Sequence, residues 1–293
     1  MTESKWKSGK PATASPWKKK VVEPARPPVP RQTAADVAGP ESRPVRPSGE
    51  MRLYGLNACL AAFARRPEQL RKVYLLESRI AELKPVLSWC AGHKLGYRIV
   101  EATDLDKLTG SRHHEGICFE MLRPPALGLD ELLRTQAPAP APSLLIWLDG
   151  VGNPHNLGAL LRSAAHFSVA GVIVPDSSTL DLSGAAARVA EGGAEAVPIV
   201  RVDDALVALA MLRSAGYTIT ATVPRDGEPL YATCLAPRNV LVFGAEGEGM
   251  SQTLIDAADR RLSIPGSGIV DSLNISVSAA IVLGEYWRQQ HPG

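Results

Sequence analysis

The sequence contains few cysteines and no grouping of metal-binding residue types. Its four cysteines are scattered singly along 293 residues, without a C-x-x-C pair or a histidine at ligand spacing. We therefore interpret them as reduced thiols buried in the core, and we predict no metal site. The adjacent histidines 113–114 are typical of a loop or surface. The cysteines are Cys59, Cys90, Cys118 and Cys234.

Long apolar runs and nucleotide-binding fingerprints are also missing. No stretch reaches the roughly 18 apolar residues that a membrane-spanning helix needs, and the Lys/Pro-rich start lacks the apolar segment of a secretory signal. We expect a cytoplasmic protein without a membrane partner. G-x-G-x-x-G and the P-loop pattern are absent, which disfavours a dinucleotide-dependent enzyme.

Positive charge is concentrated at the start of the chain. Residues 1–50 hold ten Lys/Arg against five Asp/Glu and carry +5, whereas the remaining residues carry −3, which gives the total formal charge of +2. Residues 1–50 also contain nine prolines and few large aliphatic residues. Such a composition cannot bury enough apolar surface to fold, so we predict a disordered basic tail. Lys18–Lys20 beside Trp6 and Trp17 could attract an RNA backbone or could simply be solvated.

The rest of the chain shows two alternations of helical and strand patterns. Residues 51–122 predict a small α/β domain, with helices over 55–66 and 79–92 and strands over 72–76, 97–100 and 116–122. A Pro/Ala-rich linker, extended in conformation, follows at 123–143. Residues 144–293 alternate strands with helices of 10 to 15 residues, which predicts a parallel sheet with helices on both faces.

Glycine and polar side chains follow several of these strands. The stretches that contain these loops are 149–167, where a helix capped by Asn156 is expected, 240–251 and 262–280. In the first, Gly158 would leave open space one turn before Arg162. Ligands of parallel sheets bind beyond the carboxyl ends of the strands. We therefore expect the three loops to converge on one site.

These loops carry motifs that resemble those of the SpoU/TrmH branch of the SPOUT RNA 2′-O-ribose methyltransferases. The matching residues are Asn156, Gly158 and Arg162; Gly244, Glu246 and Gly249; and Ile264, Pro265, Ser272, Leu273, Asn274 and Ser276. The resemblance covers about 144–290, and 52–122 looks like the ribosomal-protein-L30e-like substrate-binding domain of that family.

The resemblance implies a deep trefoil knot in the C-terminal domain and a bound S-adenosylmethionine. Its adenine would be held by main-chain groups at Gly244, Ile264 and Leu273, near Thr222. The catalytic residues would be Arg162, oriented by Asn156 and Glu246, together with Ser272 and Asn274. Family members are homodimers, so a homodimer is expected.

The role of Arg162 stays open between general base and stabiliser of the developing alkoxide, although a guanidinium of pKa above ~12 is hard to deprotonate. The RNA would be tRNA or rRNA. Candidate phosphate contacts are Arg65–Arg66, Arg71–Lys72 and 112–114, although the residue types favour an ordinary solvated charge at each. The alternative function is a non-catalytic RNA-binding protein that keeps the knotted scaffold.

Overall fold

The structure is a computed structural model that describes residues 49–291 except 246 and 248. The predicted tail, with Lys18–Lys20, and the predicted site residue Glu246 therefore lie outside the described residues. Within that stretch no helix has both the length and the apolar content to cross a membrane. Nor do its His, Cys, Asp and Glu side chains gather in any group of three that could hold a metal ion.

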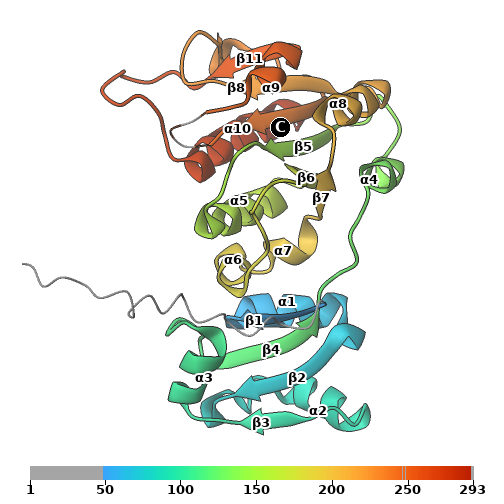
Figure 1. The fold of residues 1–293 in the computed structure, drawn as a ribbon, viewed down its shortest axis with the longest axis vertical. Coiled ribbons are helices and arrows are strands. Elements are labelled where there is room, and N and C mark those ends of the chain that lie inside the picture. Colours follow the sequence, from blue (N-terminus) through green and yellow to red (C-terminus); the bar gives the residue numbers. More distant parts are fainter. Residues whose placement is uncertain (1–48, 246, 248, 292–293) are drawn as a thin grey trace, which may run out of the picture. The chain divides into compact units, whose positions relative to one another are not determined.

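Residues 50–122 form a mixed sheet with strand order β1-β4-β2-β3 (Figure 1). β4 lies between β1 and β2 and is antiparallel to both, while β3 is parallel to β2. One face packs on α1 and α2 through an apolar cluster, and the other packs on α3. The elements are β1 (Glu50–Tyr54), α1 (Leu56–Arg65), β2 (Leu70–Leu75), α2 (Lys84–Gly92), β3 (Tyr97–Ile99), α3 (Ala102–Thr109) and β4 (Ile117–Leu122).

Residues 143–290 form the predicted parallel sheet, in the order β7-β6-β5-β10-β8-β11-β9 (Figure 1). Its strands are β5 (Ser143–Leu148), β6 (Gly171–Pro175), β7 (Ile199–Val202), β8 (Thr218–Thr222), β9 (Glu228–Pro229), β10 (Arg238–Phe243) and β11 (Arg260–Ser263). Its helices are α5 (Pro154–His166), α6 (Gly184–Ala190), α7 (Gly193–Ala196), α8 (Ala205–Ser214), α9 (Gln252–Ala257) and α10 (Ile275–Gln290).

Helices cover both faces of this sheet because its central strands are apolar on both sides. Every residue of β5 and β10 is buried. Leu241 and Phe243 pack in a cluster with residues of α5 and α10, whereas Val240 and Val242 pack in a second cluster with α8. The near-continuous hydrophobic runs seen in the sequence are what such doubly covered strands require.

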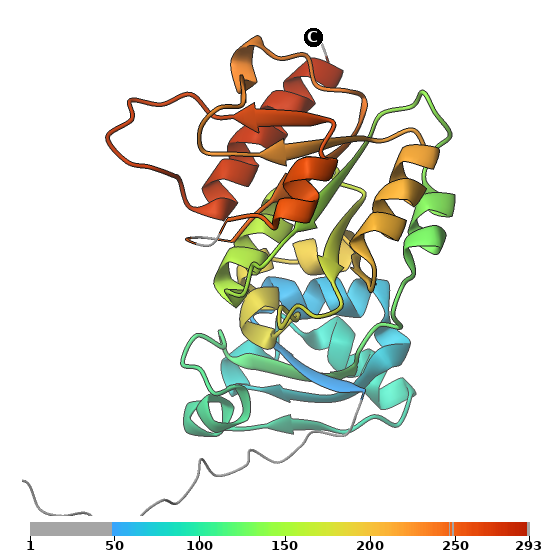
Figure 2. The same ribbon diagram turned by 45° about the horizontal axis from the view of Figure 1, so that its top comes forward.

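Several predicted details are wrong. The linker 123–143 contains a helix, α4 (Leu129–Thr135), whose Leu129 and Leu132 are buried against residues of β7 and α8; Figure 2 shows α4 (green) beside α8 (orange). The helix predicted from 79 begins at Lys84, after a 3-10 turn. Cys234 is exposed, unlike the other cysteines, and His114 is buried. None of the cysteines, all within the described residues, forms a disulfide.

Candidate functional site

The candidate site lies at the carboxyl edge of the parallel sheet. β5, β10, β8 and β11 are consecutive neighbours in the sheet, so the loops that leave them begin side by side. Thr222, Gly244 and Ile264 stand at or just beyond the ends of β8, β10 and β11. The three glycine-containing loops singled out in the sequence thus start along one edge, as the parallel arrangement demands.

A hydrogen bond joins the first loop to the third across 118 residues of sequence. Asn274 Nδ2 donates to Asn156 Oδ1 at 3.1 Å. Asn274 is also the N-cap of α10, because its Oδ1 accepts from Ser276 N at 3.0 Å. The polar residues at the start of α10 therefore have two functions. They cap the helix, and they form part of the edge where the loops meet.

The predicted cap of α5 is wrong by three residues. Asn153, not Asn156, is the N-cap, and its Oδ1 accepts from His155 N at 2.9 Å. Asn156 is the third residue of the helix, inside its first turn, where its side chain contacts Asn274. Proline at 154 explains the shift, because proline is favoured in the first turn of a helix and disfavoured later.

The second loop is a tight turn that packs against the first. Ala245 and Gly249 exchange backbone hydrogen bonds of 2.8 and 3.0 Å, and Gly247 and Gly249 have φ of +91° and +79°. A Cβ at Gly244 would lie 2.4 Å from Met250 N. The chain's own backbone occupies that space, so Gly244 is required by the turn itself.

Asp149 connects these two loops and was not predicted as a site residue. Its Oδ2 accepts from Ser251 N at 2.7 Å, at the start of α9, and its own backbone N donates to Phe243 O at 2.9 Å. The carboxylate thereby satisfies an N–H group that the helix leaves without an intrahelical partner. Its position directly after a buried strand was the available indication in the sequence.

Gly158 does not leave space for a ligand, contrary to the expectation from sequence. It is buried, and a Cβ there would lie 2.5 Å from Ala186 O and 2.7 Å from Val189 Cβ of α6. The glycine allows α5 and α6 to pack closely. Arg162, one turn later on α5, is exposed.

The third loop has room beside its glycines. A Cβ at Gly266 or Gly268 would meet no other atom within 4 Å. Ser272 is exposed, and Leu273 is 43% exposed. The Thr222 hydroxyl donates to Val242 O at 2.8 Å, which ties β8 to β10 next to Gly244. Here the loop lacks the close internal packing found at Gly158 and Gly244.

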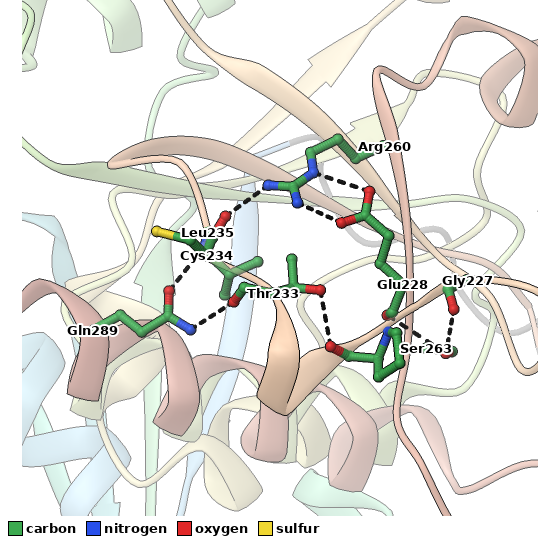
Figure 3. Close-up of polar contacts among 9 residues, drawn as sticks. Gly227, Glu228, Thr233, Cys234, Leu235, Arg260, Ser263 and Gln289 are labelled. Carbon is green, nitrogen blue, oxygen red and sulfur yellow. Dashed lines mark hydrogen bonds and ion pairs between the residues drawn. The ribbon is translucent and has the colours of Figure 1, made fainter.

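Polar contacts fasten the segment 227–235, which follows β8, to β11 and α10 (Figure 3). Arg260 of β11 forms an ion pair with Glu228, and this contact holds the pKa of Glu228 below its usual value. Gln289 of α10 donates to the Thr233 carbonyl at 2.9 Å. These contacts fix the strand and helix from which the third loop departs and to which it returns.

The candidate phosphate contacts separate into exposed and buried side chains. Arg65, Arg71 and Arg112 are exposed, as a phosphate contact requires. Arg66 is 6% exposed and pairs with Glu195, and His114 Nδ1 accepts from Gly116 N at 2.9 Å. Arg66 and His114 are therefore not phosphate contacts in this structure.

Two family models match the chain. Residues 143–284 match the model described as the SpoU rRNA Methylase family, and residues 52–125 match the model described as RNA 2'-O ribose methyltransferase substrate binding. The first matched segment corresponds to residues 143–290, called here the parallel-sheet unit. The second corresponds to residues 50–122, called here the mixed-sheet unit.

Relatives that match most of this chain carry methyltransferase names. The chain is 40% identical over 240 residues to the Uncharacterized tRNA/rRNA methyltransferase YfiF of Escherichia coli O157:H7, covering 82% of this chain and 68% of that protein. It is 36% identical over 239 residues to the 23S rRNA (guanosine-2'-O-)-methyltransferase RlmB of Escherichia coli K12, covering 81% and 98%.

Solved structures share the fold. The SpoU methyltransferase AviRb from Streptomyces viridochromogenes, in complex with AdoMet, superimposes with a TM-score of 0.67 at 23% identity, covering 84% of this chain and 92% of that chain. A structure titled RNA 2'-O ribose methyltransferase gives a TM-score of 0.65 at 26% identity, covering 83% and 89%.

Proposed function

The chain belongs to the SpoU family of RNA methylases, and we propose that it methylates a ribose 2′-hydroxyl of structured RNA, either tRNA or rRNA, with S-adenosylmethionine as donor. The relatives named above support the reaction. The structural observation that carries the proposal is the Asn156–Asn274 hydrogen bond, which joins the first and third motifs at the carboxyl edge of the sheet.

The residues at this edge fit S-adenosylmethionine. The cofactor supplies a methyl group bonded to a positively charged sulfur. Main-chain groups at the ends of β10 and β11 can bond the flat adenine, and the space beside Gly266 and Gly268 can accept it. We assign adenine binding to Gly244, Ile264 and Leu273, with Thr222 holding β8 against β10.

Arg162 is assigned to the ribose hydroxyl. A 2′-hydroxyl is a weak nucleophile, so a positive charge beside it favours the alkoxide that develops as the methyl group is transferred. Because guanidinium keeps its proton in proteins, we assign Arg162 to charge stabilisation and to the neighbouring phosphate, not to proton abstraction. Its exposed position on α5 leaves it accessible to RNA.

The remaining motif residues position these groups. Asn156 and Asn274 hold the first and third loops together, and Ser272, exposed two residues before Asn274, is placed to contact substrate or the methionine end of the cofactor. Glu246, outside the described residues, is assigned to orient Arg162 by a charge-assisted hydrogen bond.

We further propose the knot, the L30e-like fold of residues 51–122 and a homodimer. The fastening of 227–235 to α10 supports a threaded C-terminal segment. Exposed apolar side chains at the start of α10 and in the loop before it support a dimer face: Ile269, Val270 and Val277 are 88%, 66% and 48% exposed. Sedimentation equilibrium would measure the oligomeric state.

Labelled methyl transfer to unmodified 23S rRNA and tRNA transcripts tests the function. We expect transfer by the wild-type chain, none by Arg162→Ala and weak transfer by Arg162→Lys, which keeps the charge but loses the planar fork. Calorimetry should show S-adenosylmethionine binding in all three. A wild-type chain that binds RNA but not the cofactor would instead support the non-catalytic alternative.

A further inference from the structure

The mixed-sheet unit contacts the parallel-sheet unit through a charged pair that is almost completely buried. Arg66, at the end of α1, donates from Nε and Nη2 to the two carboxylate oxygens of Glu195 in α7, at 2.9 and 2.8 Å. The side chains are 8% and 11% exposed. A bidentate pair of this kind fixes both distance and orientation.

Arg66 is held rigidly on its own side of the contact. Its Nη1 donates to the Leu122 carbonyl at 2.6 Å and to Gln69 Oε1 at 2.7 Å. The guanidinium is thus part of the mixed-sheet unit, and the edge that it presents to Glu195 has a fixed direction. Because Arg66 is buried, removal of Glu195 would destabilise the folded protein: the guanidinium would keep its charge in a poorly hydrated position without an opposite charge.

Further contacts continue along α6 and α7. Asn57 Nδ2 donates to Glu191 Oε2 at 2.5 Å, and Arg188 Nη1 lies 3.3 Å from Glu115 Oε1. Ala187 of α6 packs within the apolar cluster of the mixed-sheet unit. The contact surface therefore combines apolar packing with polar and charged pairs.

The same two helices pack without gaps against the helix that carries Arg162. A Cβ at Gly193 of α7 would lie 2.6 Å from Leu161 O and 3.1 Å from Arg162 Cα. A Cβ at Gly158 would similarly strike Ala186 O of α6. Close backbone packing of this type leaves little freedom for relative movement.

We propose that α6 and α7 form a rigid contact surface for the mixed-sheet unit and thereby set its position relative to Arg162. In this proposal Arg66 and Glu195 are positioning residues for methyl transfer to RNA. This inference rests on the proposed function. RNA held by the mixed-sheet unit would reach the catalytic arginine in one orientation, so the pair would act on the productive alignment of the ribose and not on binding of RNA or cofactor.

Full-length Glu195→Ala, Arg66→Lys and the control Glu68→Ala, at an exposed residue close to Arg66 in the sequence, test the proposal. Unmodified 23S rRNA and tRNA transcripts serve as substrates, and affinities for RNA and S-adenosylmethionine are measured separately. We expect Glu195→Ala to lower kcat at least tenfold with both affinities within twofold of wild type. Arg66→Lys should show a smaller loss, and Glu68→Ala none.

A distance measurement gives a readout that is independent of activity. Dyes on the exposed Cys234 and on a cysteine introduced by Ser78→Cys report the separation of the two units by energy transfer. We expect a narrow distribution in the wild-type background and a broad one with Glu195→Ala. Retained cofactor binding shows that the parallel-sheet unit of the variant is folded.

Each result decides a separate point. A narrow distribution with wild-type kcat in Glu195→Ala overturns the proposal, and a broad distribution with unchanged kcat overturns the positioning role. Loss of RNA or cofactor affinity in step with kcat would assign the pair to binding and overturn it as well. Absence of methyl transfer by the wild-type chain would refute the proposed function. The dye distances would still decide whether the Arg66–Glu195 pair fixes the position of the mixed-sheet unit.

Discussion

The substitution Gly158→Ala distinguishes helix packing from ligand space as the reason for glycine in the first motif. The new Cβ would lie 2.5 Å from Ala186 O, a backbone atom inside α6 that cannot rotate away. Ordinary contact begins at 3.4 Å, so α5 and α6 would have to separate by about 1 Å. The methyl group would therefore strain the interface that supports Arg162.

The expected cost follows from two opposing effects. Forcing an extra methyl group into a packed core destabilises by about 1–3 kcal/mol. Alanine in a helix interior is favoured over glycine by about 1 kcal/mol. We therefore expect a net loss of about 0–2 kcal/mol and a fall in Tm of up to about 8 °C.

Gly284→Ala is the matched control, because Gly284 also lies inside a long helix, α10. A Cβ there would meet the Phe167 Cζ atom at 3.7 Å, which is an ordinary contact. This variant should be about 0.5–1 kcal/mol more stable than wild type. Urea denaturation of both variants measures the difference in the free energy of unfolding.

Methyl transfer should respond to Gly158→Ala more strongly than stability does. A displacement of about 1 Å at a catalytic group can cost on the order of a hundredfold in rate. S-adenosylmethionine affinity should change less, because the assigned adenine contacts lie on β10, β11 and the third loop. If Gly158→Ala is as stable as Gly284→Ala, the packing explanation of this glycine is refuted.

Three further substitutions test other parts of the site and fold. Arg162→Ala should abolish labelled-methyl transfer and leave S-adenosylmethionine affinity within twofold in calorimetry. Asp149→Ala removes the acceptor for Ser251 N and should weaken cofactor affinity about tenfold, whereas Asp149→Asn keeps an acceptor oxygen and should stay close to wild type. Glu285 has its pKa lowered from 4.5 to about 2 by hydrogen bonds from Arg288 and Gln289, so its stabilising effect is present above pH 4.5 and is lost as the pH falls towards 2. The stability difference between wild type and Glu285→Gln should therefore be largest near neutral pH and shrink below pH 4.5 in denaturation measurements.

The results that would contradict these expectations are specific. Turnover by Arg162→Ala would remove the arginine from the reaction. Equal cofactor affinities in Asp149→Ala and wild type would show that the bond to Ser251 does not organise the second loop. A stability difference for Glu285→Gln that is the same at pH 3 and pH 7 would contradict the lowered pKa.

The parallel sheet was predictable because its pattern is local. Doubly buried strands need continuous apolar runs, and residues 143–290 form the parallel sheet that the alternation of strands and helices predicted. The predicted helix at 79–92 started too early because helical periodicity does not register a 3-10 turn. Helix α4 was missed because flanking prolines and alanines concealed a short amphipathic turn.

The site residues were predictable from the sequence, whereas the contacts between them were not. Asn-x-Gly and the polar residues before α10 were identified from the sequence as site residues. Their partners were not, since the contact between Asn156 and Asn274 spans 118 residues and depends on which strands are neighbours. The reading of Gly158 failed for a related reason: a glycine in a helix is equally compatible with a ligand or a close helix, and composition does not distinguish them.

Sequence alone determined the alternation of strands and helices, the parallel sheet and the identity of the residues that could do chemistry, because these depend on periodicity and on residue type. Tertiary structure decided which loops lie next to each other, that the space beside Gly158 is filled by the backbone of α6, and that Arg66 is buried against Glu195. Those outcomes depend on contacts between distant parts of the chain, where the free energy of burial and packing is settled only after the strands have taken their order in the sheet.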